Sequence, residues 1–390
     1  MQKLNIGMIG YRFMGKAHSF GIDAAPFFFK NGVQPVKKVI CGRNEHLVKQ
    51  AAEEFGWEEY ETDWEKVVRR DDIDVIDVAT PTNLHKEIAI AAVKAGKHVF
   101  CEKPMSMSAQ ESREMLEAAE KAGVVHMLGH NYRRVPAIAL AKKMIDEGKL
   151  GKIYHFRAVY LQDWIMDPGF PLIWQLDKKV AGAGPHADLN SHIIDVARFL
   201  VGEIDTVVGM QETFIKRRPK AAVGEKLNTM LTADGKVETE FADVEVDDTS
   251  AFLAKFKSGA LGTFEASRFA GGRKNHERFE INGSKGTLVF NFERMNELEY
   301  WSNEDDLEVQ GFRTIMVTEG VHPYISAWWP AGHIIGYENT FVNQFADFFK
   351  CIKDNTKAQP NFYDGLKNTQ VLDAVTKSIE SKTWETVDEQ

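Results

Sequence analysis

A short glycine turn directly after the first apolar run has the pattern of a phosphate-binding loop. Residues 4–10 read LNIGMIG, residues 10–15 read GYRFMG, and a helical pattern follows. A strand, a glycine turn and a helix in this order form the dinucleotide fingerprint, because the helix N-terminus attracts the pyrophosphate. An arginine replaces the second fingerprint glycine, and it must turn away or place its guanidinium on the phosphates. We expect dinucleotide contacts from Gly10, Arg12, Phe13 and Met14, and an ordinary tight turn is the alternative.

The end of the next apolar run lacks an acidic residue. The run KKVIC ends at Cys41, and Gly42 and Arg43 stand where a carboxylate usually binds the adenosine ribose of NAD. No negative charge at this position repels a 2′-phosphate, and Arg43 could bind one. Gly42 and Arg43 therefore favour NADP slightly over NAD as the cofactor. The alternative is that Arg43 is a solvated loop residue.

A lysine follows the apolar run HVF, at the sheet edge where ligands bind in open α/β proteins. The segment reads Cys101-Glu102-Lys103-Pro104-Met105, in which Pro104 holds Lys103 extended and could form a cis bond. A partly desolvated ammonium there can hydrogen-bond a substrate hydroxyl and assist removal of a hydride from the same carbon. An exposed lysine without such a role is the alternative.

A second segment, DVATPTNLHKE at residues 77–87, also follows a buried apolar run. Because the carboxyl ends of parallel strands meet at one edge of a sheet, both segments are expected to line the same cleft. We expect cofactor contacts from Thr80, Pro81, Asn83, His85, Glu102 and Lys103. A plain Thr-Pro turn is the alternative for the first of these residues.

Two kinds of pattern divide the chain. From Leu4 to Met127, short apolar runs alternate with amphipathic helical patterns, which indicates a doubly wound parallel sheet. After Asn131, runs such as YHFRAVYL, TSAFLAKF and ELEYWS are rich in aromatic and β-branched residues at a period near two, which indicates a mainly antiparallel sheet. We expect an α/β chain with a Rossmann domain over residues 1–127 and an α+β domain over residues 128–390.

Two further stretches in the second half carry expectations. Helical patterns at residues 338–353 and 364–382 should cover the second sheet or pack back on the first domain. The acidic stretch ETEFADVEVDD at residues 238–248 is expected to be a solvated loop.

The composition excludes several classes of protein. The 390 residues carry 48 basic and 57 acidic side chains, a net charge of −9, which disfavours nucleic acid or an anionic membrane as a partner. Cys41, Cys101 and Cys351 are odd in number and far apart, so we expect no disulfide framework and no structural zinc site. No targeting segment and no apolar run near the ~20 residues that span a bilayer is visible, so we expect a cytoplasmic protein.

Four motifs are diagnostic when they are taken together. GMIGYRFMGKAHS, ATPTNLH, CEKPMS and AGAGPHADLNSHIIDVARFLVGE resemble the Gfo/Idh/MocA oxidoreductase family, and the resemblance extends over nearly the whole chain. Segments such as VHMLGHNYRR and RAVYLQDW are most similar to members that oxidise sugars, levoglucosan and inositols. The resemblance implies a Rossmann domain followed by a domain with a large open sheet, and a homodimer or homotetramer formed through the outer face of that sheet.

The resemblance also implies an activity. It is the NAD- or NADP-dependent oxidation of a secondary hydroxyl of a sugar, anhydrosugar or inositol to the ketone by hydride transfer. Two alternatives stay open: a redox-assisted, NAD-dependent glycosidase of the same superfamily, and a non-catalytic sugar or dinucleotide sensor. No metal is expected, because the 12 histidines form no ligand pattern.

By resemblance, the catalytic group consists of Lys103, Asp188 and His192. His192 takes the hydroxyl proton as the hydride leaves, Lys103 positions the hydroxyl, and Asp188 orients the substrate or the base. A neutral imidazole, with an unperturbed pKa of about 6.5, suits the role of base. Asp188 and His192 lie four residues apart in a helical pattern, so both are expected on one face of one helix.

Further polar and aromatic side chains are expected at the cleft. Residues 131–133 follow the last Rossmann strand, and residues 162–164 end the first strand of the second domain. Sugars bind through several hydroxyls and an aromatic wall, which such side chains offer. We expect Asn131 and Trp164 on the cofactor side and substrate contacts from Tyr132, Arg133, Asp163, His322, Trp328 and Trp329. Burial in the core is the alternative for each aromatic residue.

Overall fold

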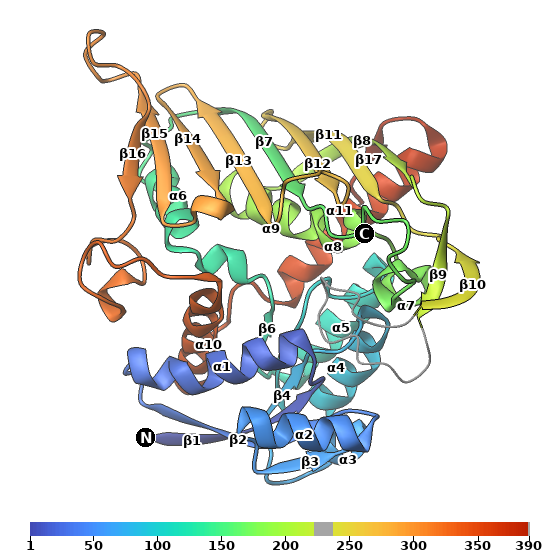
Figure 1. Cartoon of the computed structure of the whole chain (residues 1–390). Coiled ribbons are helices and arrows are strands. Elements are labelled where there is room, and N and C mark those ends of the chain that lie inside the picture. The colour runs from blue at the N-terminus through green and yellow to red at the C-terminus, as the bar shows by residue number, and fades with distance from the viewer. Residues whose placement is uncertain (222–236, 389–390) are drawn as a thin grey trace. The chain divides into compact units, whose positions relative to one another are not determined.

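In the computed structural model, which describes residues 1–221 and 237–388, six segments form one parallel sheet near the N-terminus (Figure 1). These are β1 (Gln2–Ile9), β2 (Val33–Cys41), β3 (Glu59–Glu61), β4 (Val75–Val78), β5 (His98–Cys101) and β6 (His126–Leu128). Their order is β3-β2-β1-β4-β5-β6, and every neighbouring pair is parallel. The predicted doubly wound sheet is confirmed. Because the order reverses between β1 and β4, the crevice for a ligand opens at the carboxyl ends of these two strands.

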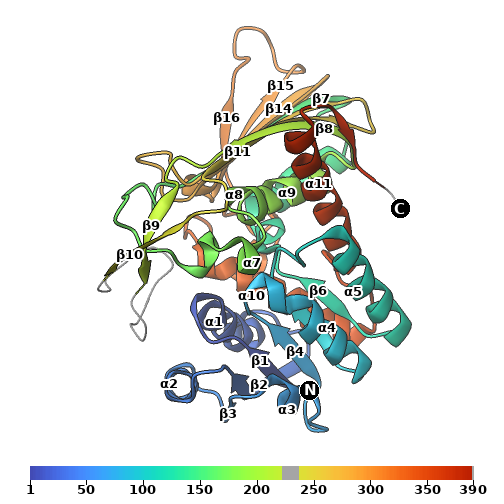
Figure 2. The ribbon, with the colours of Figure 1, turned by 90° about the vertical axis from the view of Figure 1, so that its right-hand side faces the viewer.

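Helices connect these strands in the alternation that the sequence predicted. They are α1 (Phe13–Phe28), α2 (Glu45–Phe55), α3 (Trp64–Val68), α4 (His85–Lys94) and α5 (Ala109–Ala122). Side chains begin three of them: Asn44 accepts the backbone N–H of Leu47 at α2, Asp63 accepts that of Glu65 at α3, and Ser108 accepts that of Glu111 at α5. Figure 2 shows α1 and α4 on opposite sides of the sheet, as expected for two crossovers that leave it in opposite directions.

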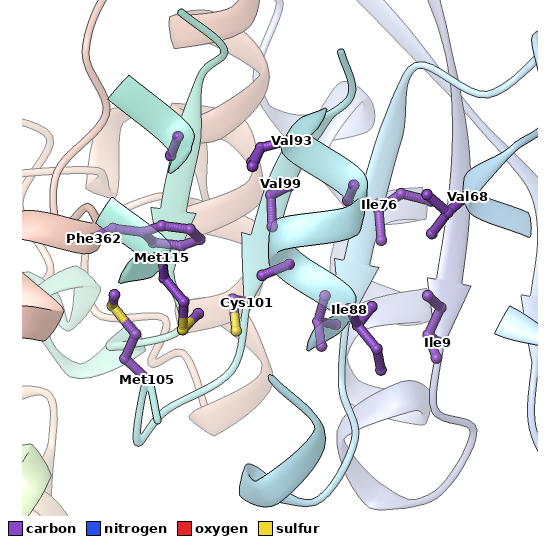
Figure 3. Close-up of a cluster of buried hydrophobic side chains, with 14 of the residues drawn as sticks. Ile9, Val68, Ile76, Ile88, Val93, Val99, Cys101, Met105, Met115 and Phe362 are labelled. Carbon is purple, nitrogen blue, oxygen red and sulfur yellow. The ribbon is translucent and has the colours of Figure 1, made fainter. Parts of the chain in front are cut away.

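The core under α4 and α5 combines strand residues with side chains from much later in the chain. Figure 3 shows Ile76 and Val99 of the strands against Ile88 of α4, with Met115 of α5 and Phe362 beside them. All five of these side chains are fully buried. Removing a side chain of this size from such a core costs about 2–5 kcal/mol. A segment near residue 362 is therefore part of the N-terminal fold.

Two long C-terminal helices follow, α10 (Tyr337–Asp354) and α11 (Phe362–Ser381). Helix α10 packs on α1, where a Cβ atom at Gly21 would lie 2.9 Å from the ring of Phe345. The absent side chain at Gly21 lets the two helices approach closely. The predicted helices are confirmed, and α10 packs back on the N-terminal sheet, one of the two alternatives left open.

Nine strands form the second sheet, in the order β16-β15-β14-β13-β7-β12-β11-β8-β17. All neighbouring pairs are antiparallel except the pair β7 and β12. The mainly antiparallel sheet is confirmed. The strands are β7 (Ile153–Leu161), β8 (Ile204–Glu212), β11 (Thr249–Phe256), β12 (Leu261–Ser267), β13 (His276–Gly283), β14 (Gly286–Asn291), β15 (Glu297–Ser302), β16 (Arg313–Met316) and β17 (Glu385–Thr386).

One face of the second sheet is covered by helices and the other is not. The covering helices are α6 (Pro136–Asp146), α8 (Pro185–Asp188), α9 (Asn190–Leu200) and the later part of α11, and a short helix, α7 (Lys178–Ala181), precedes α8. Phenylalanines from several strands fill the covered side, and the rings of Phe252 and Phe264 stack at 4.4 Å. On the other side, which we call the outer face, Val208, Met210 and Leu253 lie around a shallow hollow. No helix of the described residues covers the outer face (Figure 1).

The acidic stretch differs from its prediction. Its first residues belong to β10 (Val237–Asp243), which pairs antiparallel with β9 (Arg217–Ala221), so the prediction of a loop was wrong there. The charged side chains are satisfied across the two strands: Lys220 lies 2.6 Å from Glu240, and Arg217 lies 3.2 Å from Asp243. Cross-strand pairing of opposite charges stabilises a ribbon that composition alone does not suggest.

The chain folds into two compact units, and neither is one continuous segment. The first unit comprises Met1–Arg134 and Ile335–Thr369, and the second comprises Val135–Ile334 and Gln370–Gln390. The chain therefore passes between the units three times, and α11 contributes to both. A domain boundary between residues 127 and 128 stays a prediction.

Candidate active site

The glycine turn of the first unit packs closely against its neighbours only because side chains are absent. Gly10 has a φ of 120°, and a Cβ atom there would lie 2.2 Å from the carbonyl oxygen of Ala79. A Cβ atom at Gly15 would lie 2.6 Å from the carbonyl oxygen of Gly10. Both positions therefore require glycine. The fingerprint glycines that the sequence singled out are needed for the close approach of the strand, the turn and the helix.

The start of α1 suits an anion. The first turn of α1 contains no acidic residue, and the Arg12 side chain immediately before it is exposed. The first backbone N–H groups of a helix have no partner inside the helix and carry a partial positive charge. Phe13 and Met14, two other predicted cofactor contacts, lie in the same turn and are exposed and half-buried. These groups fit the pyrophosphate of a dinucleotide.

The end of β2 is more acidic than the sequence indicated. Burial and the negative charges of Glu61 and Asp63 raise the pKa of the Cys41 thiol to about 12, which places both carboxylates near this strand end. Glu61 is the last residue of β3, and its backbone oxygen accepts the N–H of Gly42 at 3.0 Å. Hydrogen bonds from the backbone N–H groups of Thr62 and Asp63 hold the pKa of Glu61 low, so its carboxylate is charged. Sequence reasoning missed these groups because it did not predict β3, which is three residues long and polar.

Tyr11 lies against Gly42. A Cβ atom at Gly42 would lie 2.1 Å from the Tyr11 ring, so this position also requires the absence of a side chain. Arg43 is exposed at the same strand end and precedes the Asn44 cap of α2. The structure thus brings the glycine turn and the end of β2 together, as the prediction of a nucleotide site requires.

The segments that follow β4 and β5 lie at one sheet edge, because these two strands are parallel neighbours. His85 joins the segments: its ring nitrogens lie 2.9 Å from the carbonyl oxygens of Thr80 and Pro104. The ring is buried, which makes His85 a brace between the two segments. The hydroxyl oxygen of Thr80 is also buried and has no hydrogen-bond partner among the described residues. An unsatisfied polar atom at this edge fits a group that a bound cofactor would supply. Pro81 is half-buried and Asn83 exposed beside it.

Lys103 is half-buried, and its peptide bond to Pro104 is cis. Its backbone N–H donates to Oε2 of Glu102 at 3.2 Å. Glu102 is 4% exposed, so this carboxylate serves as an internal support for Lys103.

Residues 131–133, in the turn that follows β6, contribute internal contacts of the first unit. Asn131 donates from its side chain to the Thr340 hydroxyl at 2.8 Å, and Arg133 forms an ion pair with Asp364 at 3.0 Å. Tyr132 is 4% exposed. Asn131 and Arg133 therefore attach the late segment 335–369 to the strands of the first unit.

Asp188 and His192 lie in the second unit, on two helices. Asp188 is the last residue of α8, and His192 lies in the first turn of α9. Leu189 separates the two helices. The expectation of one continuous helix was wrong. Pro185 starts α8, and the Asp247 carboxylate accepts the backbone N–H groups of Gly184 at 2.7 Å and His186 at 2.8 Å, which fixes the start of α8. The apolar positions predicted for this segment, Leu189, Ile193, Val196, Ala197 and Leu200, are all buried.

A buried arginine holds Asp188. Arg268 is 1% exposed, and its Nη2 donates to Oδ2 of Asp188 at 2.6 Å. The guanidinium also lies over the ring of Trp164, 5.2 Å from its centroid, and Trp164 donates to Gln162 at 2.8 Å. Sequence reasoning missed Arg268, which stands in SRFAGG at the end of β12. The only signal was an arginine directly after an apolar strand.

The ring of His192 packs against a tyrosine. His192 is 6% exposed, and its ring meets the edge of Tyr160, with centroids 5.7 Å apart. The Tyr160 hydroxyl donates to Oδ1 of Asn275 at 2.7 Å. These contacts leave His192 little freedom to rotate, which suits a group that must meet a substrate in one orientation.

The remaining predicted substrate residues lie elsewhere in the second unit. Asp163 pairs with Lys274 at 2.8 Å, and this pairing together with the backbone N–H of Gly272 lowers the pKa of the carboxyl. His322 accepts the backbone N–H of Glu319 at 3.1 Å. Trp329 is half exposed and Trp328 half-buried. Over residues 1–221 and 237–388, no group of three or more histidine, cysteine, aspartate or glutamate side chains is placed to hold a metal ion.

Family models cover most of the chain. Residues 4–130 match the model described as oxidoreductase family, NAD-binding Rossmann fold, and residues 138–289 match the GFO/IDH/MocA C-terminal domain. The chain belongs to the Gfo/Idh/MocA family of NAD-binding oxidoreductases, as its four motifs predicted.

Individual relatives are similar over the full length. Levoglucosan dehydrogenase of Pseudarthrobacter phenanthrenivorans is 43% identical over 387 residues, 98% of each chain. A structure of levoglucosan dehydrogenase in complex with NADH and levoglucosan is 42% identical and superposes with a TM-score of 0.92 over 100% of both chains. An oxidoreductase domain protein from Kribbella flavida is 48% identical, with a TM-score of 0.93 over 100% of both chains. The predicted similarity to sugar-oxidising members is confirmed.

Proposed function

We propose that this protein oxidises a secondary hydroxyl of a sugar, anhydrosugar or inositol to the ketone by hydride transfer to a nicotinamide. The observation that carries the proposal is the 43% identity to levoglucosan dehydrogenase over 98% of both chains. Myo-inositol 2-dehydrogenase of Thermotoga maritima, 26% identical over 381 residues, widens the substrate class beyond anhydrosugars. Levoglucosan is the first substrate to test.

Three side chains are proposed to carry the chemistry. The oxidised nicotinamide, when bound, accepts the hydride. Lys103 donates a hydrogen bond to the reacting hydroxyl and stabilises the negative charge that develops on its oxygen. Neutral His192 accepts the hydroxyl proton, and Asp188 orients the substrate or the base. The ion pair of Asp188 with Arg268 supports this role, because it keeps the carboxylate charged and fixed in direction.

The remaining contacts are proposed in two groups. The adenosine and pyrophosphate end of the cofactor is assigned to Gly10, Arg12, Phe13, Met14, Gly42 and Arg43, and the nicotinamide end to Thr80, Pro81, Asn83, Lys103, Asn131 and Trp164. His85 and Glu102 act as supports of that end. Substrate contacts are assigned to Tyr132, Arg133, Asp163, His322 and Trp329. Two of these side chains already form ion pairs in the structure, Asp163 with Lys274 and Arg133 with Asp364.

NAD is the nucleotide that we propose, against the slight preference for NADP suggested by Gly42 and Arg43. The charged carboxylate of Glu61 and that of Asp63 lie near the end of β2 and would repel a 2′-phosphate. Structures of levoglucosan dehydrogenase, 42% identical, contain NADH. A ratio of kcat/KM for NAD over NADP well above one would support this choice, and a ratio below one would restore the preference for NADP.

A homodimer or homotetramer is proposed on the outer face of the nine-stranded sheet. Met210 is 71% and Leu253 49% exposed there, although both are large and apolar. A second copy covering this face would remove such side chains from water. The expected mass by light scattering is two or four times that of one chain, and Leu253→Glu should lower it.

A cytoplasmic location is also proposed. The three cysteines are free and two of them are buried, as expected for a protein in a reducing compartment. Of the helices in the described ranges, none is both long and apolar enough to cross a membrane.

The test of the proposed function is the growth of the reduced-nicotinamide absorbance. The purified protein is mixed with NAD or NADP and with levoglucosan, glucose, myo-inositol, scyllo-inositol or a glycoside. Growth of the band with one of these compounds supports the dehydrogenase. Release of the aglycone from a glycoside without net NADH points to the redox-assisted glycosidase. Binding of sugar and cofactor without either product points to the sensor.

A further inference from the structure

Three ionisable side chains form a continuous chain inside the first unit. His18 of α1 is completely buried, and its Nδ1 lies 3.0 Å from both carboxylate oxygens of Asp77, which lies on β4. Its Nε2 lies 3.1 Å from Oε1 of Glu102, directly after β5. Each of the two carboxylates is itself buried. One imidazole therefore joins the fingerprint helix to two neighbouring strands of the parallel sheet.

The imidazole of this chain is charged. Burial disfavours the charge, but attraction to Asp77 and hydrogen bonds to Asp77 and Glu102 outweigh it and raise the pKa of His18 to about 10. Both ring nitrogens then carry a hydrogen and donate, one to each carboxylate. The aromatic rings of Phe100, Phe341 and Phe345 surround the imidazole with centroids 5.2–5.6 Å away. Water is excluded on these sides, so the charge pairs act in a poorly polar environment.

The second oxygen of Glu102 extends the chain to Lys103. Oε2 of Glu102 accepts the backbone N–H of Lys103 at 3.2 Å, while Oε1 is held by His18. Room for this carboxylate exists because residue 129 is glycine: a Cβ atom at Gly129 would lie 2.3 Å from Oε1. The carboxylate is thus fixed at both oxygens and bridges a buried cation to the main chain of Lys103.

We propose that His18, together with Asp77 and Glu102, is a positioning residue for Lys103, because it fixes the main chain from which the lysine side chain extends. This inference rests on the catalytic role proposed for Lys103. An amine that must meet one hydroxyl loses activity when its origin moves, and a displacement of about 1 Å costs up to about 100-fold in rate. His18 is completely buried, so it acts through Glu102.

A double-mutant cycle tests the proposal. His18→Gln is made in the natural chain and in Lys103→Ala, and kcat, KM and the Kd of NADH are measured with the substrate that gives turnover. Alone, His18→Gln should lower kcat about 10- to 100-fold and leave KM and the Kd within about twofold. In the Lys103→Ala background it should cost less than about twofold more, since the group that it positions is gone. Losses that multiply in the two backgrounds would overturn the proposal.

His126→Gln is the matched control. This half-buried histidine of the same unit accepts the N–H of Phe362 at 3.1 Å and packs on that ring, and neither contact leads to Lys103. It should lower thermal stability without lowering kcat more than about twofold. An equal fall in kcat for both variants would mean that general loosening of the unit explains the effect, and the proposal would be wrong.

A readout without turnover keeps the two proposals separable. Amide hydrogen exchange of the peptide that contains Lys103 should become at least about tenfold faster in His18→Gln and stay unchanged in His126→Gln. Asp77→Asn, which preserves shape and an acceptor, serves if His18→Gln does not fold, and it should show the same change at a smaller size. Unchanged exchange in the folded variant would contradict the positioning role. Full turnover of Lys103→Ala alone would instead contradict the catalytic role of Lys103.

Discussion

His18 in the first unit and Glu277 in the second are both buried and titratable, yet the protein surrounds them in opposite ways. His18 stands between two carboxylates that keep it charged. Glu277, on β13, has both carboxyl oxygens buried without a hydrogen-bond partner among the described residues. Burial, and then the negative charge of Asp195, raises the pKa of Glu277 to about 8. A buried group keeps its charge where opposite charges surround it, and it becomes neutral where they do not.

The largest effects, on kcat, are expected at the proposed catalytic residues, Lys103 in the first unit and His192 in the second. Lys103→Ala and His192→Ala should each lower kcat by roughly 100-fold or more, because a hydrogen-bond donor or a proton acceptor is lost from the transition state. The Kd of NADH should stay nearly unchanged in both, as measured by nicotinamide fluorescence. An equal loss of cofactor affinity would contradict these roles.

The next largest effect, on the stability of the fold, is expected at the ion pair of Arg268 and Asp188 in the second unit. Arg268→Met leaves the Asp188 carboxylate without its buried cation and should lower the free energy of unfolding by about 3 kcal/mol, measured by urea denaturation. This value is at the low end for broken buried pairs, because the Asp188 side chain is 27% exposed. Adding Asp188→Asn removes the stranded charge and should restore part of the loss. If the double variant is less stable than Arg268→Met alone, the pair does not act as described.

Glu277, a buried carboxyl without an opposite charge beside it, predicts how the free energy of unfolding depends on pH. Its pKa is about 8 in the folded protein and 4.5 ordinarily, so the folded state binds the proton more tightly. The unpaired carboxyl then costs no stability below pH 4.5, and stability falls as the pH rises from 4.5 to 8, by at most about 5 kcal/mol. In Glu277→Gln this contribution should disappear. The free energy of unfolding of the variant should therefore rise relative to that of the natural chain between pH 5 and pH 8. Equal slopes in the two proteins would show that Glu277 is charged when folded.

The contribution of His18 to stability changes over a higher pH range than that of Glu277. Its folded pKa of about 10 exceeds the ordinary 6.5, so its stabilisation is complete below pH 6.5 and is lost as the pH rises through 10. Glu277→Gln should therefore keep a decline of stability from about pH 6.5 to 10, the range set by His18. Glu117→Gln, at an exposed carboxyl on α5, is the control and should change neither window.

The smallest effect is expected at the surface. Asp163→Asn removes an ion pair with Lys274, whose side chain is 80% exposed, and should change the free energy of unfolding by less than about 1 kcal/mol. The same variant tests a proposed substrate contact. A several-fold rise in KM with unchanged kcat would support Asp163 as a substrate ligand.

The sequence predicted the elements well and their long-range pairings poorly. Periodicity located β11 and β15 at their observed bounds, and the glycine turn, the Lys103 segment and the helical pattern around His192 were visible as local motifs. The supports of these motifs were not visible. His18 lies 59 residues from Asp77 and 84 from Glu102, and Arg268 lies 80 from Asp188. No local period links such residues, so only the fold reveals them.

Two errors have a similar physical origin. The strand β3 and the ribbon of β9 and β10 are polar, and their strands are held by main-chain hydrogen bonds and cross-strand charges. An apolar period cannot signal an element that buries little apolar surface. The break at Leu189 was missed because helical spacing continues across it, and Leu189 itself keeps right-handed helical backbone angles.

The return of α10 to the N-terminal unit has a consequence during synthesis. Strands β1 to β6 leave the ribosome early, but Phe341 and Phe345, which enclose His18, are made some 200 residues after β6. Until then the fingerprint helix has an uncovered side, and the buried charges beneath it are open to water on that side. The unit that begins translation is therefore among the last to be completed, and nascent chains cut before α10 should not retain dinucleotide.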